Sequence, residues 1–307
     1  MSTTELVIVG AGGVLGAKLV ERALACTDGP IHAYTHGATP AIPARASARV
    51  TWRALDISDG AAVRAAIAAA RPRVVINAAA MTNVDACETR REAALAANAG
   101  GPRHLAEACV AAGARLLHVS TDYVFPGDDD QPGPYLEDAS VRTVNYYGQT
   151  KLEGERAVEA TCAGRASWLV ARTALVYGHV PGGRTNFVKF VVGELRAGRR
   201  IKVVNDQWNT PTLADDLAAA LLALAGAASE GIIHLAGPEL LSRQQWAEAI
   251  AAHYALDAAL IDVTTTAALS QVAARPLRSG LRSRRAAELG GLTFRDARGG
   301  MDALEIA

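Results

Sequence analysis

Short runs of apolar, mostly β-branched residues alternate with longer alanine-rich segments throughout the first half of the chain. This alternation is typical of βαβ units and predicts a parallel sheet. Runs such as Leu-Val-Ile-Val at residues 6–9 are apolar at every position, as expected for strands that helices cover on both faces. The expected strands are Glu5–Val9, Ile31–Thr35, Val50–Leu55, Arg73–Asn77, Arg115–Ser120 and Ser167–Arg172.

Helices are expected between these strands and again nearer the C-terminus. In the first half they are Leu15–Cys26, Gly60–Ala70, Val84–Ala112 with a break near Gly100-Gly101-Pro102, and Tyr146–Thr161. In the second half, which is richer in loops, they are Thr185–Ala197, Leu213–Ala225 and Arg243–Tyr254. We therefore expect an α/β fold, with a Rossmann-like doubly wound parallel sheet in residues 1–173 and a smaller C-terminal α/β substrate domain in residues 174–307. Some segments of the second domain are left free to cross back to the first.

The composition excludes several kinds of partner. With 307 residues, of which 50% are hydrophobic, the chain is long enough to bury a core without disulfides. Basic and acidic residues number 31 each, so no overall field attracts nucleic acid or an anionic membrane. The longest nearly uncharged stretch, Leu217–Ala228, is far shorter than the roughly 20 residues that span a bilayer. We expect neither nucleic acid nor a membrane as a partner.

The cysteines and the N-terminus indicate a cytoplasmic protein. The four cysteines are far apart, form no Cys-x-x-Cys pair and have no histidines at metal-ligand spacing. The first residues lack the basic region of a signal peptide. Carboxylates do not cluster in a way that suits Mg²⁺, so no metal site is expected.

A glycine-rich turn follows the first expected strand. Gly10 permits the tight turn, Gly13 allows close approach of a pyrophosphate, and Gly16 allows close helix packing, while the helix N-terminus supplies amide donors. The residues expected at the cofactor here are Gly10, Gly12, Gly13, Val14, Leu15 and Gly16. Glycines also mark ordinary turns, but their place after the first strand favours a dinucleotide.

Two further strand ends are expected to contact the adenosine half of that cofactor. Asp56 and Ile57 close the third strand, where they could contact the adenine; an Asp that caps the next helix is the alternative. Thr35 and His36 stand at the end of the second strand, where an acidic residue would bind the ribose hydroxyls of NAD. The missing carboxylate favours NADPH and leaves NADH open, since no arginine follows to bind a 2′-phosphate.

The strongest chemical signal is Tyr147-Gly-Gln-Thr-Lys151. Residues four apart share one helix face, so the Lys151 ammonium can lie beside the Tyr147 phenol and lower its pKa from about 10. Tyr147 then becomes a proton donor and acceptor, with Thr121 on the preceding strand end beside it. The alternative is an amphipathic helix in which these residues are incidental.

With these motifs the chain resembles the extended short-chain dehydrogenases/reductases, and more narrowly the dTDP-4-dehydrorhamnose reductase family. The matching residues are Asn77–Asp85, Ser120–Gly127, Tyr147–Lys151, Arg172-Thr173, Val176–Gly178, Asn186-Phe187, Asp206-Gln207, Thr210–Thr212, His234–Gly237, Arg275-Pro276, Ser279 and Leu281. They cover almost the whole chain in family order.

The resemblance implies that NADPH gives a hydride to the C4 carbonyl of a nucleotide-linked 4-keto-6-deoxysugar. Tyr147 would protonate the developing alkoxide, Thr121 would bind the same oxygen, and Lys151 would lower the Tyr147 pKa and hold the nicotinamide ribose. Ala78, Ala79 and Ala80 would line the cofactor. Asn98, on the following helix, resembles the structural asparagine of the wider superfamily, and an exposed helix residue is the alternative for it. The expected substrate contacts are Val84, Asp85, Thr121, Asp122, Tyr123, Leu175, Asn186, Trp208 and Arg275. Packing or capping is the alternative for Val84, Asp85, Tyr123 and Asn186, loop anchoring for Trp208, and a solvated surface for Arg275.

Other functions stay open on the same scaffold. Related dehydratases carry Thr-Asp-Glu where this chain has Thr121-Asp122-Tyr123, so elimination lacks its base. Leu175 stands near the place of a tryptophan common in the rhamnose-forming reductases, which leaves an epimerase or a reductase of another nucleotide sugar open. A non-catalytic NADP-binding regulatory subunit, like the methionine adenosyltransferase β-subunit, is a further alternative, which the retained Tyr147 and Lys151 argue against. Oligomeric state is undetermined, with a homodimer among the options.

Overall fold

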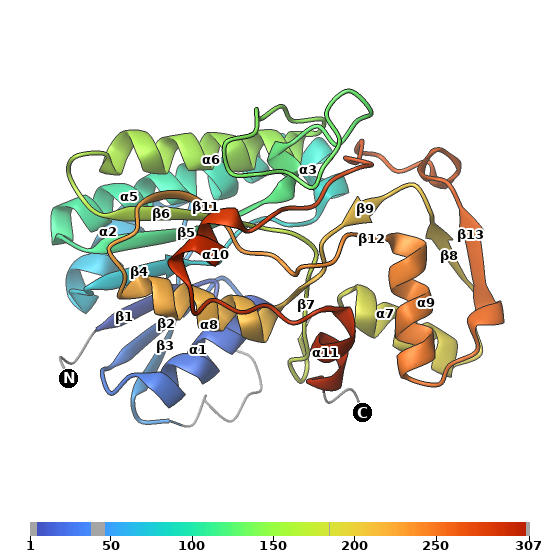
Figure 1. The fold of residues 1–307 in the computed structure, drawn as a ribbon. Coiled ribbons are helices and arrows are strands. Elements are labelled where there is room, and N and C mark those ends of the chain that lie inside the picture. The colour runs from blue at the N-terminus through green and yellow to red at the C-terminus, as the bar shows by residue number, and fades with distance from the viewer. Residues whose placement is uncertain (1–4, 38–46, 184, 305–307) are drawn as a thin grey trace.

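A seven-stranded parallel sheet forms the centre of the computed structural model, which describes residues 5–37, 47–183 and 185–304. Residues 1–4 and 38–46 of the first predicted domain, and residues 184 and 305–307 of the second, lie outside the described residues. The order across the sheet is β11-β6-β5-β4-β1-β2-β3 (Figure 1). The strands are β1 (Leu6–Val9), β2 (Ile31–Thr35), β3 (Val50–Ala54), β4 (Val74–Asn77), β5 (Arg115–Thr121), β6 (Trp168–Thr173) and β11 (Gly231–His234). The predicted fold class, a Rossmann-like parallel sheet, is confirmed.

Helices cover both faces of this sheet (Figure 1). On one face lie α1 (Val14–Cys26) and α8 (Ala214–Ala225), whose apolar residues pack on the odd-numbered side chains of β5 and β6. On the other face lie α2 (Gly60–Ala70), α5 (Gly101–Ala112) and α6 (Tyr146–Cys162). Because helices bury the central strands from both sides, β1 and β4 are apolar at nearly every position.

A smaller region lies beyond the carboxyl ends of the central strands (Figure 1). Its core gathers around Trp246, Val191 and Ile201. Its elements are β7 (Val176–Tyr177), α7 (Phe187–Arg196), β8 (Ile201–Val204), β9 (Trp208–Asn209), β10 (Thr212–Leu213), β12 (Leu241–Ser242), α9 (Arg243–His253), β13 (Ile261–Thr264) and α11 (Ala297–Asp302). The late helix α10 (Arg284–Leu289) packs against β11 of the central sheet instead. Short two-stranded pairs, β10 with β7, β12 with β9 and β13 with β8, connect these elements.

The chain crosses between the two regions more than once. Strand β11 pairs in parallel with β6 and so belongs to the central sheet. Helix α8 packs against α1 and so covers one face of that sheet, although both elements come late in the sequence. The prediction that some segments after residue 173 pack with the first domain agrees with these two elements. The division at residue 173 itself stays a prediction.

One predicted helix break was wrong. The chain leaves the helical conformation at Arg90 (φ −118°, ψ 55°), between α3 (Val84–Thr89) and α4 (Arg91–Leu95). At the glycines it instead continues through a π-helical turn, Ala96–Gly100, into α5. Pro102 fits there because the start of a helix tolerates a missing amide hydrogen. Within the described ranges, no helix is long and apolar enough to cross a membrane.

Candidate active site

The glycine turn between β1 and α1 has no room for side chains at two positions. Gly10 has a φ of 82°, and a Cβ atom there would lie 2.6 Å from the amide nitrogen of Ala79. A Cβ atom on Gly16 would lie 2.1 Å from the carbonyl oxygen of Gly10. Gly13 caps α1 without a side-chain hydrogen bond, so the first amides of the helix remain available to an anionic ligand.

The other residues predicted to contact the cofactor near the pyrophosphate lie close to the glycine turn. Gly12, Val14 and Leu15 belong to the turn and the first helical turn. Ala78 follows β4 and donates its amide hydrogen to Val9, while the Ala78–Ala79 backbone faces Gly10. The three residues Ala78–Ala80 are half-buried. The structure therefore brings the ends of β1 and β4 together as one small-residue surface.

The ends of β2 and β3 form the outer part of this region. The Thr35 hydroxyl donates to the carbonyl of Gly37 at 2.9 Å, and the exposed His36 Nδ1 lies 3.9 Å from Asp56 Oδ2. Asp56 accepts hydrogen bonds from the hydroxyl and the amide of Ser58, which lower its pKa. Among the described residues at the end of β2, no carboxylate occupies the position of an NAD ribose ligand.

The alternative for Asp56, a helix cap, was wrong. Asp59 caps α2 and accepts from the amides of Ala61 and Ala62 at 2.9 and 3.0 Å. Ile57 is buried against Gly101. A Cβ atom on Gly101 would lie 2.5 Å from Cδ1 of Ile57. Ile57 thus holds α5 close to the end of β3.

The predicted catalytic residues come together at the start of α6. Asn145 caps this helix by accepting from the Gly148 amide at 2.8 Å. Tyr147 and Lys151 follow one helical turn apart, and both are buried. Thr121, the last residue of β5, is close enough to Tyr147 for its hydrogen bond to affect the Tyr147 pKa.

The pKa of Tyr147 does not follow the sequence-based expectation. Burial raises it well above 10, and the negative charge of Asp122 adds to this, while the hydrogen bond of Thr121 lowers it in part. Lys151 is not among the main influences on it. The lowering of the Tyr147 pKa by Lys151 stays a prediction for the complex with cofactor. Tyr147 is a protonated phenol at neutral pH.

Lys151 is held by its own partners. Its Nζ donates to the Val119 carbonyl at 2.8 Å and lies 3.3 Å from His118 Nε2. Asn77 Nδ2 faces His118 Nδ1 at 3.0 Å, so Nδ1 accepts and Nε2 carries the ring hydrogen. Burial lowers the pKa of Lys151 to about 8, although the charge of Glu155 opposes this shift.

Asn98 is a buried residue of the π-helical turn and not an exposed helix residue. Its Oδ1 accepts from the Met81 amide at 2.8 Å, and its Nδ2 donates to the Met81 carbonyl and the Thr150 hydroxyl, both at 3.1 Å. Asn98 therefore connects the loop after β4 to α6. This agrees with the structural role that the resemblance implied.

Asp122, expected at the substrate, connects the sheet to the C-terminal segment. It is buried and accepts from the hydroxyl of Ser279 at 2.5 Å, Nδ2 of Asn209 at 3.0 Å and the hydroxyl of Thr121 at 3.2 Å. Burial raises its pKa although these bonds oppose the shift. Ser279 and Asn209 were not predicted at the site, because they lie far from Asp122 in sequence.

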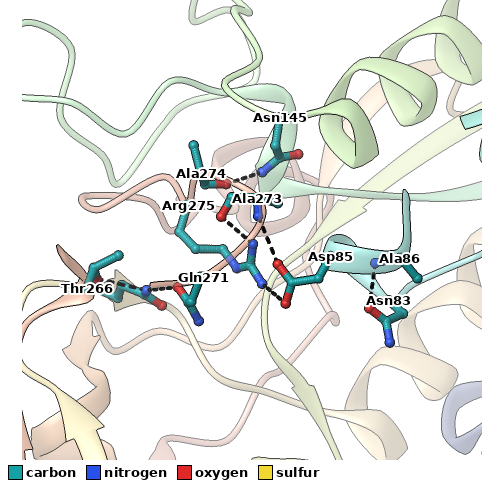
Figure 2. A network of polar contacts seen from close by, with 10 residues as sticks. Asn83, Asp85, Ala86, Asn145, Thr266, Gln271, Ala273, Ala274 and Arg275 are labelled. Atoms are coloured by element: carbon teal, nitrogen blue, oxygen red, sulfur yellow. Dashed lines mark hydrogen bonds and ion pairs between the residues drawn. The ribbon is translucent and has the colours of Figure 1, made fainter. Parts of the chain in front are cut away.

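Asp85 and Arg275, also expected at the substrate, contact each other (Figure 2). Arg275 Nη2 lies 2.9 Å from Asp85 Oδ2, and its Nη1 donates to the Ala273 carbonyl at 2.7 Å. Asp85 also accepts from the Ala273 amide at 2.9 Å, and Asn145 donates to the Ala274 carbonyl at 2.7 Å. The segment 273–275 is therefore fastened to the starts of α3 and α6.

Of the other expected substrate residues, Tyr123 and Val84 lie beside Tyr147. The ring of Tyr123 meets that of Tyr147 edge to face, with centroids 5.5 Å apart, and Val84 packs in the same cluster. Leu175 lies one residue before β7 with a φ of 42°, an uncommon conformation for a residue other than glycine. Such backbone strain is frequent at functional sites.

Asn186 and Trp208 have the local roles that were the alternatives for them. Asn186 caps α7, accepts from the Lys189 amide at 3.2 Å and donates to the Gly178 carbonyl at 2.6 Å. Trp208 belongs to β9, and its amide donates to the Leu277 carbonyl at 2.7 Å. Both hold loops in place, and their contact with substrate stays a prediction.

Sequence reasoning missed one cation near these residues. Arg243, the first residue of α9, acts through its charge on Tyr123 and Asp122. Nothing in the sequence around it distinguishes it from an ordinary helix start. Within the described residues, no three His, Cys, Asp or Glu side chains are grouped to hold a metal ion.

A doubly wound parallel sheet, a glycine turn after its first strand and a buried Tyr-x-x-x-Lys pair beside a strand-end threonine define an extended short-chain dehydrogenase/reductase. The family described as the RmlD substrate binding domain matches residues 4–304, and the chain belongs to that family.

Named relatives agree with this membership. A dTDP-4-dehydrorhamnose reductase of Mycobacterium tuberculosis (strain CDC 1551 / Oshkosh) is 40% identical over 293 residues, covering 94% of this chain and 88% of the relative. A dTDP-4-keto-6-deoxy-D-glucose reductase of Streptomyces niveus is 35% identical over 232 residues, covering 76% and 72%. The crystal structure of a Bacillus anthracis dTDP-4-dehydrorhamnose reductase in complex with NADP superimposes with a TM-score of 0.83 at 27% identity, covering 98% of each chain. The predicted family resemblance is confirmed.

Proposed function

We propose that this protein catalyses the NADPH-dependent reduction of the C4 keto group of a nucleotide-activated 4-keto-6-deoxysugar, in the formation of dTDP-L-rhamnose or a related deoxysugar. The observation that carries the proposal is the buried Tyr147–Lys151 pair beside Thr121, at the carboxyl ends of the central strands. The predicted enzyme class, an oxidoreductase of sugar nucleotides, and the predicted cofactor are confirmed by the relatives described above.

The residues at the glycine turn fit a dinucleotide. Gly10 and Gly16 leave no space for a side chain, and the uncapped start of α1 offers amide hydrogens to a pyrophosphate. Lys151 and Tyr147 would hold the nicotinamide end. When bound, NADPH supplies the hydride for the carbonyl carbon.

The raised pKa of Tyr147 suits reduction, because a reductase needs a proton donor. The phenol stays protonated at neutral pH and can transfer its hydrogen to the carbonyl oxygen as negative charge develops there. When substrate binds, the Thr121 hydroxyl would turn its hydrogen from Asp122 to the same oxygen. The Lys151 ammonium then stabilises the phenolate that Tyr147 leaves behind.

The surroundings of Asp122 favour reduction over water elimination. Its oxygens accept hydrogen bonds from Ser279, Asn209 and Thr121, and the next residue is Tyr123 where dehydratases have a glutamate. An epimerase, or a reductase of another nucleotide sugar, stays an alternative, and the Streptomyces niveus relative acts on a different 4-keto sugar by its name. The regulatory subunit stays the non-catalytic alternative.

Replacing Tyr147 with Phe tests the proposal. We expect NADPH oxidation with dTDP-4-dehydrorhamnose to fall by about 10²- to 10⁴-fold, because the proton donor is lost. NADPH binding should be kept. Tyr146→Phe is the matched control, since Tyr146 is the neighbouring tyrosine and its ring contacts Arg91 on the surface. If the wild-type protein binds NADPH but does not oxidise it with any 4-keto sugar tested, the result would contradict the proposed reaction and favour the regulatory alternative.

The cellular setting belongs to the proposal as well. We place the protein in the cytoplasm with a nucleotide sugar as substrate, and a homodimer is one assembly to test by light scattering. The absence of a metal site, of nucleic acid and of a membrane partner stays a prediction.

A further inference from the structure

Arg243 is held in a defined position at the edge of the candidate site. Ser242 caps α9 by accepting from the Gln245 amide at 3.1 Å, and the Arg243 amide donates to the Gln207 carbonyl at 2.9 Å. The guanidinium carbon lies 5.1 Å from the centroid of the Phe187 ring. Backbone bonds and ring contact therefore fix both ends of the side chain.

The charge of Arg243 has no carboxylate partner of its own. Among the described residues, none places a carboxylate oxygen within 4.0 Å of it. Asp122 is near enough for its charge to act on Arg243, but its oxygens are already bound by Ser279 and Asn209. A half-buried guanidinium that lacks an anion costs free energy.

A second cation faces the same space. The charge of Arg275 also acts on Arg243, and it adds to burial in lowering the Arg243 pKa. Tyr123, whose ring touches that of Tyr147, is affected by both arginines. The backbone places Arg243 near Asp122 and Tyr123 as well, because Ser242 pairs with Trp208 and the adjacent Asn209 donates to Asp122. Two neighbouring guanidinium groups repel each other and attract a ligand with more than one negative charge.

We propose that Arg243 binds the diphosphate of the nucleotide-sugar substrate, with Arg275, and so places the sugar against Tyr147. This inference rests on the proposed function. A guanidinium offers paired N–H donors that match phosphate oxygens. Arg275 already has Asp85 as a counter-charge, so Arg243 contributes the larger share of the affinity for phosphate.

The test compares ligands that differ in their number of phosphate groups. Thymidine, dTMP and dTDP are titrated by calorimetry into NADP-loaded wild type, Arg243→Met and Arg243→Lys. Met keeps the apolar contact with Phe187 and removes the charge. We expect Arg243→Met to weaken dTDP binding by about 10- to 100-fold and thymidine binding by less than about 2-fold, because one charged hydrogen-bonding group is lost. Arg243→Lys should fall between the two proteins, and Arg64→Met, an exposed arginine on α2, should match wild type.

Each other outcome overturns the inference. Equal dTDP affinities of wild type and Arg243→Met would show that Arg243 does not contact the phosphates. Equal losses for thymidine and dTDP would show that the residue only maintains local structure. If wild type binds NADPH but none of the three compounds, the proposed substrate class fails together with the inference.

Discussion

Two ion pairs flank the candidate site, and they are built differently. Glu155 on α6 and Arg172 on β6 form a pair whose side chains are 4% and 3% exposed, with nitrogen and oxygen 2.6 Å apart. Asp85 on α3 and Arg275 in the C-terminal segment lie 2.9 Å apart, but their side chains are 42% and 10% exposed. The first pair joins neighbouring elements of the central sheet region, whereas the second joins the two halves of the chain.

The difference in exposure indicates that the Glu155–Arg172 pair is permanent, whereas water or another anion can reach the Asp85–Arg275 pair. Arg172 Nε contacts both carboxylate oxygens of Glu155, and its guanidinium carbon lies 5.1 Å from the centroid of the Phe125 ring. Water cannot replace such a partner inside the protein. Asp85 is in contact with water, so the exchange of its carboxylate for a phosphate, as proposed above for Arg275, would leave no carboxylate buried without a partner.

Breaking the buried pair should have the largest effect on stability. Arg172→Met leaves the Glu155 carboxylate buried without a partner, so we expect the free energy of unfolding to fall by about 3–5 kcal/mol. Urea unfolding measures this. Arg199→Met is the control: its pair with Glu194 is at the surface, with side chains 59% and 31% exposed, and should contribute less than about 1 kcal/mol. Equal losses in the two variants would mean that burial does not separate the pairs.

The lowered pKa of Lys151 should make the free energy of unfolding depend on pH. Its pKa is lowered from 10.5 to about 8, so between these values the unfolded chain binds more protons than the folded one. Stability therefore rises with pH across this window. We expect the stability of wild type to gain about 2 kcal/mol relative to Lys151→Met between pH 8 and pH 10.

The measurement is urea unfolding of both proteins at several pH values. The difference between them is the relevant quantity, because buried Cys109 and Tyr147 titrate in both. A constant difference across the window would show that the Lys151 amine is solvated.

The exposed pair should give the smallest change. Asp85→Asn keeps an oxygen for the Ala273 amide and removes the counter-charge of Arg275. We expect a loss of less than about 1 kcal/mol in stability. Binding of dTDP should become tighter, because the diphosphate no longer competes with the carboxylate, and calorimetry checks this. Weaker binding of dTDP would indicate that Asp85 itself contacts the nucleotide sugar.

The sequence predicted the central region well because its signals are local. The six expected strands agree with the observed ones to within one residue at each end, since apolar runs and turns mark them directly. The helix break was misplaced because glycines and proline suggested a stop at Gly100, while the backbone turns at Arg90. At Gly101 the glycine serves close packing instead, because a Cβ atom there would lie 2.5 Å from Cδ1 of Ile57.

Residues of the site were predictable where they are close in the chain. Tyr147 and Lys151 are four residues apart on one helix, so spacing alone places them together. Ser279 lies 157 residues from Asp122, and no pattern in the sequence announces their hydrogen bond. Arg243 depends in the same way on how the second region packs on the first.

Strand β11 has a consequence for how the chain is made. Because β11 is the outer neighbour of β6, a nascent chain that has emerged from the ribosome only as far as β6 has β6 itself at one edge of its sheet. That edge stays open while α7, α8 and the strands between them are synthesised. The backbone groups of β6 find their last partners only when residues 231–234 emerge. Synthesis from the N-terminus therefore completes the central sheet only after much of the smaller region has been made.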